Sequence, residues 1–575
     1  MIIMISSVKN VQILVSLLKQ HNIKDIVISP GSRDFQLVHS VETDSFFRTY
    51  TVVDERSAAF FANGLSMAID KPVCVCCTSS TASSNYMAAA KDAFANGIQL
   101  VLLTADRDYR RLYQMEDQMI DQVDMYGAYV RSNVDIPIVK DSDDEWYATR
   151  KINEAILELN HGVKGPVQIN YQLMDLSAPF VETMPEYRKI TRYQEDDLLS
   201  SVEIFKQKLL SKKRIMVLCG QQEENNLSAL LEEFFIKYNT IIIKDNYSNI
   251  HGEHFIKTVL VTERMSVNAF IDYCPDLVIT IGKHVWSFVK YTLRDKKLKF
   301  EHWRISEDGK IVDPFNKLTS VFQCSAEFFM ETVTAGVNSN NNLEYYNLWK
   351  TRLSKVCYPE LVYSNFYAIS ELVKKIPDSA LVHSSILNAA RLYDFVSDDK
   401  ALLSFANLGA DGIDGCLPTF LGQAEADKTR PAYLISGDLS FFYAMNSLCG
   451  DIPDNAHIFL INNHSGSEFH TNFGKFYNGS LSVDKHIAAG HISNAKDWAL
   501  ENNIKYITAD SKESLKSGLD VFINTFDSPV LFEVFTDPDT DTSVLESFYS
   551  INKVITPKMY FRKALDIIKK HLHIK

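Results

Sequence analysis

The sequence predicts an α/β fold built on parallel sheets and arranged in three successive blocks. Short apolar runs alternate along the chain with amphipathic stretches of helical period. That alternation is typical of βαβ units, whose strands are buried on both faces. A length of 575 residues is enough for about three or four domains.

The apolar runs fall in order within the three blocks. An amphipathic helix is predicted over Val8 to Gln20, before the first strand. The first block has predicted strands at 26–28, 73–77, 100–103 and 167–170, and it closes near 179–180. The second has strands at 214–219, 241–243 and 277–281, and it ends in the asparagine-rich stretch 338–342. The third begins near Leu353 and carries strands at 432–435 and 457–461.

Composition excludes several classes of protein. The formal net charge of -13 argues against a nucleic-acid partner, because no basic surface dominates. Nine cysteines in so long a chain are too few for a disulfide framework, and none has zinc-ligand spacing. No segment has the length and apolarity of a signal peptide or a membrane span. We therefore expect a cytoplasmic enzyme or binding protein. The basic segment 558–575 is predicted as a helix that docks on its own domain, with a membrane surface as the alternative.

The most informative stretch runs from Gly437-Asp438 to Asn462-Asn463. Each of these pairs follows a predicted strand, and ligands of parallel sheets bind beyond the carboxyl ends of strands. A carboxylate and an amide oxygen placed there suit a Mg²⁺ ion that also holds phosphate oxygens. The alternative is that Gly, Asp, Ser and Asn serve only as turn residues.

Four more polar segments follow predicted strands in the first block. They are SPGSR (29–33), DERSAAFF (54–61), CTSSTA (77–82) and LTADR (103–107). In the second of them, Glu55 begins an alanine-rich helical stretch, either as a charge that favours the start of the helix or as an acid that exchanges a proton.

Taken together and in this order, these segments resemble one family closely. It is the thiamine-diphosphate-dependent 2-succinyl-5-enolpyruvyl-6-hydroxy-3-cyclohexene-1-carboxylate (SEPHCHC) synthase family of menaquinone biosynthesis. The resemblance covers nearly the whole chain and extends through GPVQIN (165–170), GADGIDG (409–415), GDLSFFYAMNSL (437–448) and LINN (460–463).

The resemblance implies three domains and a homo-oligomer. The implied domains are a pyrimidine-binding domain (1–185), a central domain (186–345) and a domain that binds the diphosphate and Mg²⁺ (346–575). In this superfamily the cofactor lies between the first domain of one subunit and the third of another. A homodimer or homotetramer is therefore expected.

The resemblance also implies a role for individual residues. Asp438, Asn463 and the backbone carbonyl of Ser465 would bind Mg²⁺, with Mn²⁺ as the alternative ion. Glu55 would hydrogen-bond N1′ of the aminopyrimidine, and Ile413 would be the apolar wedge that bends the cofactor. The diphosphate would be lined by Gly437, Ser384 and Ser440. Gln118 matches an active-site amide, and Arg33 and Arg107 match contacts to substrate carboxylates. The implied reaction decarboxylates a 2-oxo acid and transfers the acyl-anion equivalent to an acceptor.

The sequence departs from the family at substrate contacts. Three cationic positions are lost, since Asn388, Leu408 and Phe288 stand where the family has arginine or lysine. Two acidic residues are gained, Asp117 for an asparagine and Glu468 for an apolar residue. A substrate carboxylate buried without its cation is costly. We therefore predict an acceptor other than isochorismate, and pyruvate is a plausible donor in place of 2-oxoglutarate.

Three alternatives remain. The chain is the SEPHCHC synthase itself if nearby cations compensate, and the candidates are Arg391, Lys290, Arg110 and Arg111. It is a simple 2-oxo-acid decarboxylase if a group such as His383, His464 or His470 supplies a proton instead of an acceptor. It is a non-catalytic binding protein if it keeps the fold without the cofactor.

Overall fold

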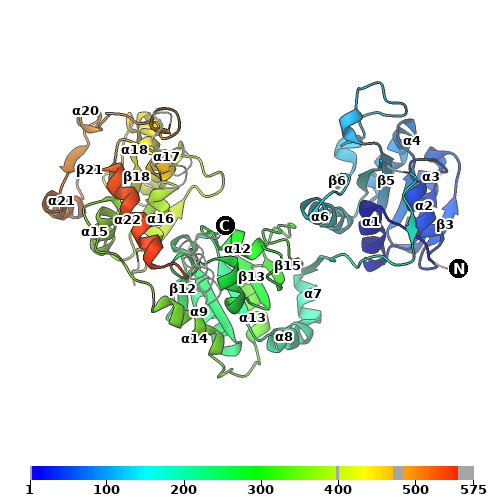
Figure 1. Cartoon of the computed structure of the whole chain (residues 1–575), viewed down its shortest axis with the longest axis horizontal. Coiled ribbons are helices and arrows are strands. Elements are labelled where there is room, and N and C mark those ends of the chain that lie inside the picture. Colours follow the sequence, from blue (N-terminus) through cyan, green and yellow to red (C-terminus); the bar gives the residue numbers. More distant parts are fainter. Residues whose placement is uncertain are drawn as a thin grey trace, which may run out of the picture. The chain divides into compact units, whose positions relative to one another are not determined.

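The structure is a computed structural model, and it describes residues 3–174, 176–223, 225–263, 265–396, 400–470 and 483–554 (Figure 1). The predicted basic helix at 558–575 lies outside the described residues. The chain forms two compact units, Met1–Tyr193 with Gly309–Val321 and Gln194–Asp308 with Phe322–Lys575. Each unit is described by itself.

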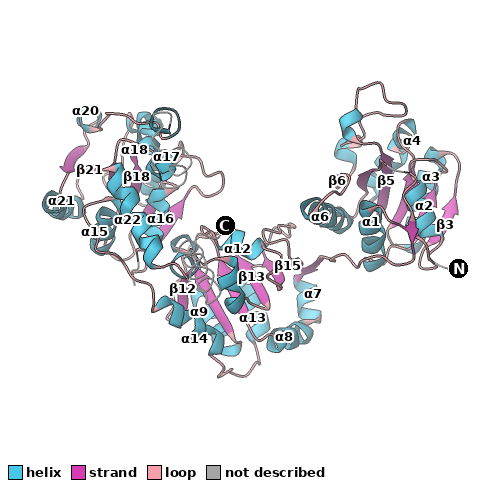
Figure 2. Ribbon diagram, viewed as in Figure 1, coloured by secondary structure: helices cyan, strands magenta, loops and turns pink. Residues whose placement is uncertain are grey.

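The first unit is built on a six-stranded parallel sheet with strand order β3-β2-β4-β5-β7-β6. Figure 2 shows strands of this unit in magenta and its helices in cyan. Its strands are β2 (Asp25–Ile28), β3 (Arg48–Thr51), β4 (Val73–Cys77), β5 (Leu100–Asp106), β6 (Ser132–Ile136) and β7 (Val167–Gln172). Its helices are α1 (Lys9–Gln20), α2 (Phe35–Glu42), α3 (Glu55–Ile69), α4 (Thr81–Ser84), α5 (Met87–Asn96) and α6 (Ser142–Glu158). The predicted helix and all four predicted strands of this block are present.

Strands β5 and β7 run further than the apolar pattern predicted, because polar side chains within the sheet satisfy one another. Thr104 Oγ1 donates to Asn170 Oδ1 at 2.8 Å, and Asn170 Nδ2 donates to Asp106 Oδ2 at 3.0 Å. These hydrogen bonds satisfy polar side chains inside the sheet where both strands extend beyond the predicted ranges.

A short segment from later in the chain completes the first unit. Residues 309–321 supply Ile311, Leu318 and Val321, which pack with Ile190 in a small apolar cluster. Asp313 accepts hydrogen bonds from Trp146 Nε1 at 3.0 Å and Arg188 Nη2 at 2.8 Å. Strands β1 (Ile5–Ser6) and β8 (Phe180–Val181) form a separate antiparallel pair.

The central sheet has seven strands in the order β12-β11-β10-β13-β14-β15-β9, and the first five are parallel. The strands are β9 (Thr191–Gln194), β10 (Ile215–Cys219), β11 (Thr240–Lys244), β12 (Phe255–Lys257), β13 (Leu277–Ile281), β14 (Glu301–Ile305) and β15 (Leu318–Gln323). The helices are α7 (Glu195–Ser200), α8 (Val202–Ser211), α9 (Leu227–Lys237), α10 (Thr258–Thr262), α11 (Val267–Phe270), α12 (Val289–Arg294), α13 (Ala326–Thr334) and α14 (Glu344–Leu353).

Helix α14 packs on the central domain. Its Trp349 ring lies 5.8 Å from Phe270 and 4.8 Å from Tyr273, measured between ring centroids. Tyr346 contacts Phe235 edge-on at 5.0 Å. The expected start of the third domain at residue 346 therefore falls inside a helix whose apolar side belongs to the central domain.

The third sheet is parallel, with the order β17-β16-β18-β19-β21-β20. Its strands are β16 (Leu381–Ser384), β17 (Leu403–Ala406), β18 (Ala432–Gly437), β19 (Ala456–Asn462), β20 (Lys505–Ala509) and β21 (Val530–Phe535). Its helices are α15 (Asn365–Lys375), α16 (Asn388–Phe395), α17 (Cys416–Ala426), α18 (Asp438–Ala444), α20 (Lys496–Glu501), α21 (Lys512–Asn524) and α22 (Pro538–Ile551). The parallel α/β fold class predicted from the sequence is confirmed.

The first and third sheets share one strand topology, which predicts where each binds a ligand. In both, the first strand in sequence lies between the second and the third. Successive connections leave that first strand in opposite directions, which opens a crevice at its carboxyl end. The crevices expected from this topology lie after β2 and β4 in the first sheet and after β16 and β18 in the third.

No helix in the described part of the chain is long and apolar enough to cross a membrane.

Candidate active site

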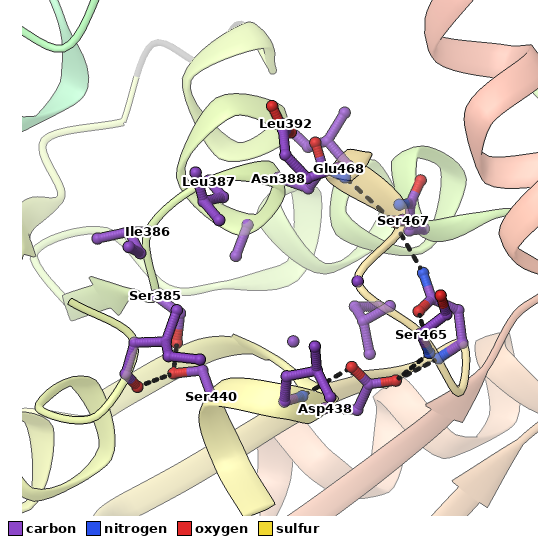
Figure 3. A pocket seen from close by; sticks show the side chains of 18 of the residues that line it. Ser385, Ile386, Leu387, Asn388, Leu392, Asp438, Ser440, Ser465, Ser467 and Glu468 are labelled. Carbon is purple, nitrogen blue, oxygen red and sulfur yellow. Dashed lines mark hydrogen bonds between the residues drawn. The ribbon is translucent and has the colours of Figure 1, made fainter. Parts of the chain in front are cut away.

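A cavity of about 160 Å³ opens at the carboxyl ends of β16, β18 and β19 (Figure 3). The segments that follow these strands line it, together with Ile413 from the loop after β17 and residues of α15 and α16. Apolar side chains form much of its wall, and its polar groups come from a few residues of these segments. Its lining residues include Ser385, Leu387, Asn388, Ile413, Gly437, Asp438, Ser440, Asn463, Ser465, Ser467 and Glu468.

Asp438 is the carboxylate at the base of this cavity, and it is almost fully buried. Its Oδ1 accepts from the backbone N–H of Leu439 at 2.7 Å. Its Oδ2 accepts from the backbone N–H groups of Asn463 and Ser465 at 3.1 and 3.2 Å. The carboxylate therefore joins the loop after β18 to the loop after β19.

The amide of Asn463 has a fixed orientation. Its Nδ2 donates to Asp541 Oδ2 at 2.9 Å and to Ser467 Oγ at 3.1 Å. Asn463 Oδ1 accepts from the backbone N–H of Ser465 at 3.3 Å. The Ser465 carbonyl accepts from Ser467 N at 2.9 Å and keeps a second lone pair. A buried carboxylate, an amide oxygen and a carbonyl are the hard oxygen donors that Mg²⁺ requires, so this set fits the ion.

Ile413 and Ser440 are held together on the other side of the cavity. Ser440 Oγ donates to the backbone carbonyl of Ile413 at 2.7 Å. The hydroxyl of Ser385 lies 3.2 Å from Ser440 Oγ and 2.9 Å from Ser436 Oγ. These contacts fix the loop that presents the Ile413 side chain to the cavity.

Ser384 does not line the cavity. Its Oγ lies 2.6 Å from Tyr247 Oη of the central domain, and its side chain is fully buried. The neighbouring Ser385 lines the cavity instead. A role for Ser384 at the diphosphate stays a prediction, and in this structure its hydroxyl bonds to the central domain.

Arg391 forms a buried ion pair with Glu468. Each side chain is 9% exposed. Arg391 Nη2 donates to Glu468 Oε1 at 3.0 Å, and Nη1 donates both to Glu468 Oε2 and to Asn388 Oδ1. Asn388 in turn donates from Nδ2 to Ser467 Oγ at 3.1 Å. The cation nearest to the lost family arginine is thus bound by a carboxylate of the same chain.

The other candidate cations differ in their surroundings. The Arg110 side chain is bound bidentately by Asp108. Lys290 is half-buried, with its Nζ 5.4 Å from the centroid of the Tyr291 ring, and Arg111 is exposed.

The three histidines that were candidates for proton donation are also placed. His383 is buried between Gln423 Oε1 (2.8 Å) and Asn407 Oδ1 (2.9 Å), and burial lowers its pKa to about 4. His383 is therefore neutral near pH 7 and serves as a structural link. His464 stacks on Phe535 with ring centroids 5.8 Å apart, and His470 Nε2 lies 3.2 Å from Ser465 Oγ.

In the first unit, Arg33 and Arg107 lie close together at the carboxyl ends of β2 and β5. Arg33 Nη1 donates to the carbonyl of Leu173 at 3.2 Å, and Arg107 Nη1 pairs with Glu116 at 3.0 Å. Burial, and then the charge of Arg107, lowers the pKa of Arg33. Gly31 permits this turn, because a Cβ there would lie 2.4 Å from Thr78 Cβ.

Glu55 and Gln118 occupy the same edge of the first sheet. Glu55 is half-buried at the first position of α3, and Asn85 Nδ2 donates to its Oε2 at 3.4 Å. Gln118 is exposed in the loop between β5 and β6, with a left-handed φ of 51°. Its backbone carbonyl accepts from Ser79 Oγ at 3.0 Å.

Asp34, beside Arg33, carries a testable pH dependence. It is fully buried, and neither carboxylate oxygen has a partner among the described residues. Burial raises its pKa from 3.8 to about 6. The folded state therefore binds this proton more tightly than the unfolded state, and the stability it contributes is lost as pH rises from about 4 to 6.

We expect Asp34→Asn to stabilise the first unit at pH 7.5 by about 1–3 kcal/mol and to flatten that pH dependence. Hydrogen exchange of peptides covering 25–42, measured in urea at pH 5 and pH 7.5, checks this. Equal destabilisation at both pH values would contradict it and would show that the carboxylate makes favourable contacts.

The fold agrees with what comparisons to known proteins show. Residues 8–125 match the model of the thiamine pyrophosphate enzyme N-terminal TPP-binding domain. The chain is thus a thiamine-diphosphate-dependent enzyme, since thiamine pyrophosphate is the same cofactor.

Full-length relatives define the family. The SEPHCHC synthases of Bacteroides thetaiotaomicron and Phocaeicola vulgatus are each 34% identical to the chain, over 95% of the chain and 99% of their own length. The synthase of Flavobacterium psychrophilum is 30% identical, over 94% of the chain and 98% of its own length. The chain belongs to the SEPHCHC synthase family, as its motifs predicted.

Several groups at the site were not predicted from the sequence. Asp541 orients the Asn463 amide from the first turn of α22, and Ser467 bridges Asn463 to Asn388. His491 Nε2 lies 3.3 Å from Asp438 Oδ2, while its Nδ1 accepts from Ser493 N at 3.1 Å. None of these residues stands in one of the quoted motifs, and each meets the site only through folding.

Proposed function

We propose that the protein is a carboligase that uses thiamine diphosphate and Mg²⁺ and whose substrates carry fewer carboxylates than 2-oxoglutarate and isochorismate. In the proposed reaction the bond between C1 and C2 of a 2-oxo acid breaks and carbon dioxide leaves. The former carbonyl carbon then bonds to a carbonyl or enone acceptor, and one proton is taken up. Bound thiamine diphosphate supplies the electron sink for these steps.

The proposed cofactor site is centred on the cavity of the third domain. Asp438, Asn463 and the Ser465 carbonyl would hold Mg²⁺, with Mn²⁺ as a substitute. Gly437, Ser440 and the neighbouring Ser385 would face the diphosphate, and Ile413 would contact the thiazolium. The convergence of these oxygen-bearing groups in one cavity supports this assignment.

Glu55, Gln118, Arg33 and Arg107 are proposed to act on the aminopyrimidine and on the substrates. They stand at the sheet edge where the shared topology predicts ligand binding. We propose a homodimer or homotetramer, with 1–185, 186–345 and 346–575 as approximate domains and the last boundary moved to the end of α14. Exposed Phe60, Phe61 and Met67 on α3 support a covered face beside Glu55.

The observation that carries the substrate proposal is the buried pair of Arg391 and Glu468. Asn388, Leu408 and Phe288 stand where the motifs of the family predict a cation, and Arg391 is the cation placed to replace the first of the three. Its hydrogen bonds already go to Glu468 and Asn388. A substrate carboxylate would have to displace Glu468 from Arg391. Glu468 belongs to the same chain, so its contact with Arg391 does not carry the loss of translational and rotational freedom that a substrate bound from solution does.

The second candidate is the SEPHCHC synthase reaction itself, which the names of the relatives favour. Incubating the enzyme with thiamine diphosphate, Mg²⁺, 2-oxoglutarate and isochorismate separates the two. We expect a kcat/KM for the succinyl adduct at least about 100-fold below that for an uncharged 2-oxo acid with a suitable acceptor, the equivalent of about 3 kcal/mol. Efficient formation of the adduct would overturn the proposal. Release of carbon dioxide with a protonated product, whatever acceptor is added, would indicate a simple decarboxylase.

A further inference from the structure

A second cavity, of about 180 Å³, adjoins the cofactor cavity. Leu387 and Glu468 line both cavities, so they form the boundary between them. Leu387 holds an unusual backbone conformation for a leucine, with φ 64° and ψ -126° at the start of α16. Such strain persists where the surroundings fix a residue, and it concentrates at functional sites.

Aromatic rings from the central domain form the far wall of this second cavity. Trp286, Phe288 and Tyr291 line it, and the centroids of the Phe288 and Tyr291 rings are 5.8 Å apart. Phe288 is 49% exposed and Tyr291 is 54% exposed. Two large rings left open beside a cavity offer a flat, uncharged surface for a ligand.

The charges around this cavity disfavour an anion. Its carboxylates are Glu263, Asp411 and Glu468, and its cations are Lys290 and Arg391. Glu468 already binds Arg391. Burial raises the pKa of Asp411, and the nearby charge of Lys290 opposes that rise, so Lys290 has a carboxylate neighbour of its own. An entering carboxylate would add to an excess of negative charge.

We propose that this cavity is the subsite for the side chain of the 2-oxo acid, that it selects an uncharged aromatic side chain, and that Glu468 is the specificity-determining residue. The assignment rests on the proposed function. The 2-oxo carbon must reach the cofactor in the first cavity, so the side chain of the 2-oxo acid begins there. The second cavity is the neighbouring space into which that side chain would extend, beyond Leu387. Glu468 binds the Arg391 guanidinium, the group that would otherwise bind a substrate carboxylate.

Carbon dioxide release from four 2-oxo acids tests the selectivity in the wild-type enzyme loaded with thiamine diphosphate and Mg²⁺. The panel is phenylpyruvate, 4-methyl-2-oxopentanoate, pyruvate and 2-oxoglutarate, each without acceptor. We expect kcat/KM for phenylpyruvate to exceed that for 2-oxoglutarate at least about 100-fold. A preference for 2-oxoglutarate or for pyruvate would overturn the inference while leaving the decarboxylating function in place. Absence of release from every acid would instead count against the proposed function.

Variants of the ion pair test the role of Glu468. Glu468→Gln keeps the shape of the side chain and frees Arg391, and we expect it to lower KM for 2-oxoglutarate about 10-fold or more with little change in kcat. The matched control is the double variant Arg391→Met with Glu468→Leu, which removes both charges and should gain no 2-oxoglutarate activity. An equal gain in both variants, or a gain in neither, would overturn the role of Glu468.

Calorimetry with inert ligands gives a readout independent of turnover. We expect 3-phenylpropionate to bind the wild type more tightly than glutarate, and we expect glutarate to gain affinity about 10-fold in Glu468→Gln. If Glu468→Gln does not fold because Arg391 has lost its carboxylate partner, the inference is still tested by the affinities of the wild type and of the double variant for the two ligands. Tighter binding of glutarate than of 3-phenylpropionate by the wild type would overturn the inference even if no 2-oxo acid is turned over.

Discussion

Replacing Asp438 by alanine is expected to remove measurable binding of thiamine diphosphate in the presence of Mg²⁺. Asp438 is the one charged group among the three proposed metal ligands, and it is almost fully buried. Loss of one partner from a buried charge interaction costs about 3–5 kcal/mol. We therefore expect the dissociation constant to rise at least about 100-fold, because each 1.4 kcal/mol is tenfold.

Two further variants separate the charge from the architecture of the loop. Asp438 Oδ2 also accepts from the backbone N–H groups of Asn463 and Ser465, so alanine loosens the loop as well as removing a ligand. Asp438→Asn keeps an oxygen for those N–H groups and removes only the charge. We expect Asp438→Asn to bind about 10- to 100-fold more weakly than the wild type. Asp451→Ala, at an exposed carboxylate of the same domain, is the control and should bind normally.

Isothermal titration calorimetry at saturating Mg²⁺ measures these affinities, and thermal unfolding without cofactor shows whether each variant is folded. Normal binding by a folded Asp438→Ala variant would show that the metal is held elsewhere. A defect in Asp451→Ala of the same size would show that the measurement reports general destabilisation.

The positions of the main site residues followed from the sequence because strand ends are readable in it. Apolar runs mark buried parallel strands, and ligands meet the residues just beyond their carboxyl ends. That reasoning placed Asp438 and Asn463 on adjoining loops, where the structure has them. It also placed Arg33 and Arg107 at one edge of the first sheet.

The pairing of Arg391 with Glu468 was not readable in the same way. The two residues are separated by 77 positions. In the sequence, Glu468 is a departure from the family pattern and Arg391 is a candidate to replace a lost cation, and nothing there links the two. Whether a cation near a site is available depends on where its side chain points and on what it meets there. Only the packing of α16 against the loop after β19 brings this carboxylate to this arginine.

The consecutive serines at the end of β16, Ser384 and Ser385, show a second limit. Side chains at the end of a strand alternate between the two faces, so one serine meets the cavity and the other meets whatever covers the opposite face. Ser384 faces Tyr247 of the central domain, and Ser385 faces the cavity. The motif alone does not say which face the central domain covers. Asp541 escaped prediction because it acts through Asn463 and stands outside the quoted motifs.

Replacing Glu55 by glutamine is expected to lower the rate of decarboxylation while leaving binding of the cofactor nearly intact. In the proposed role, one carboxylate oxygen of Glu55 shares a proton with N1′ of the aminopyrimidine. Glutamine has the same shape and can still hydrogen-bond, but it cannot take up or release that proton. A positioned acid or base contributes about 10²- to 10⁴-fold, and we expect a loss of that size.

The measurements pair a rate with a binding constant. We expect kcat for the best 2-oxo acid, and the rate of deuterium exchange at C2 of the bound cofactor, to fall at least about 100-fold. The dissociation constant for thiamine diphosphate should change less than about tenfold, because the diphosphate and Mg²⁺ carry most of the binding. The matched control is Asp54→Asn, which removes the neighbouring carboxylate but keeps a residue that caps α3, where Asp54 accepts from Ser57 N at 2.7 Å. If Glu55→Gln exchanges and turns over like Asp54→Asn, another group holds the proton at N1′, and the half-buried carboxylate at the start of α3 is only a favourable charge at the end of a helix.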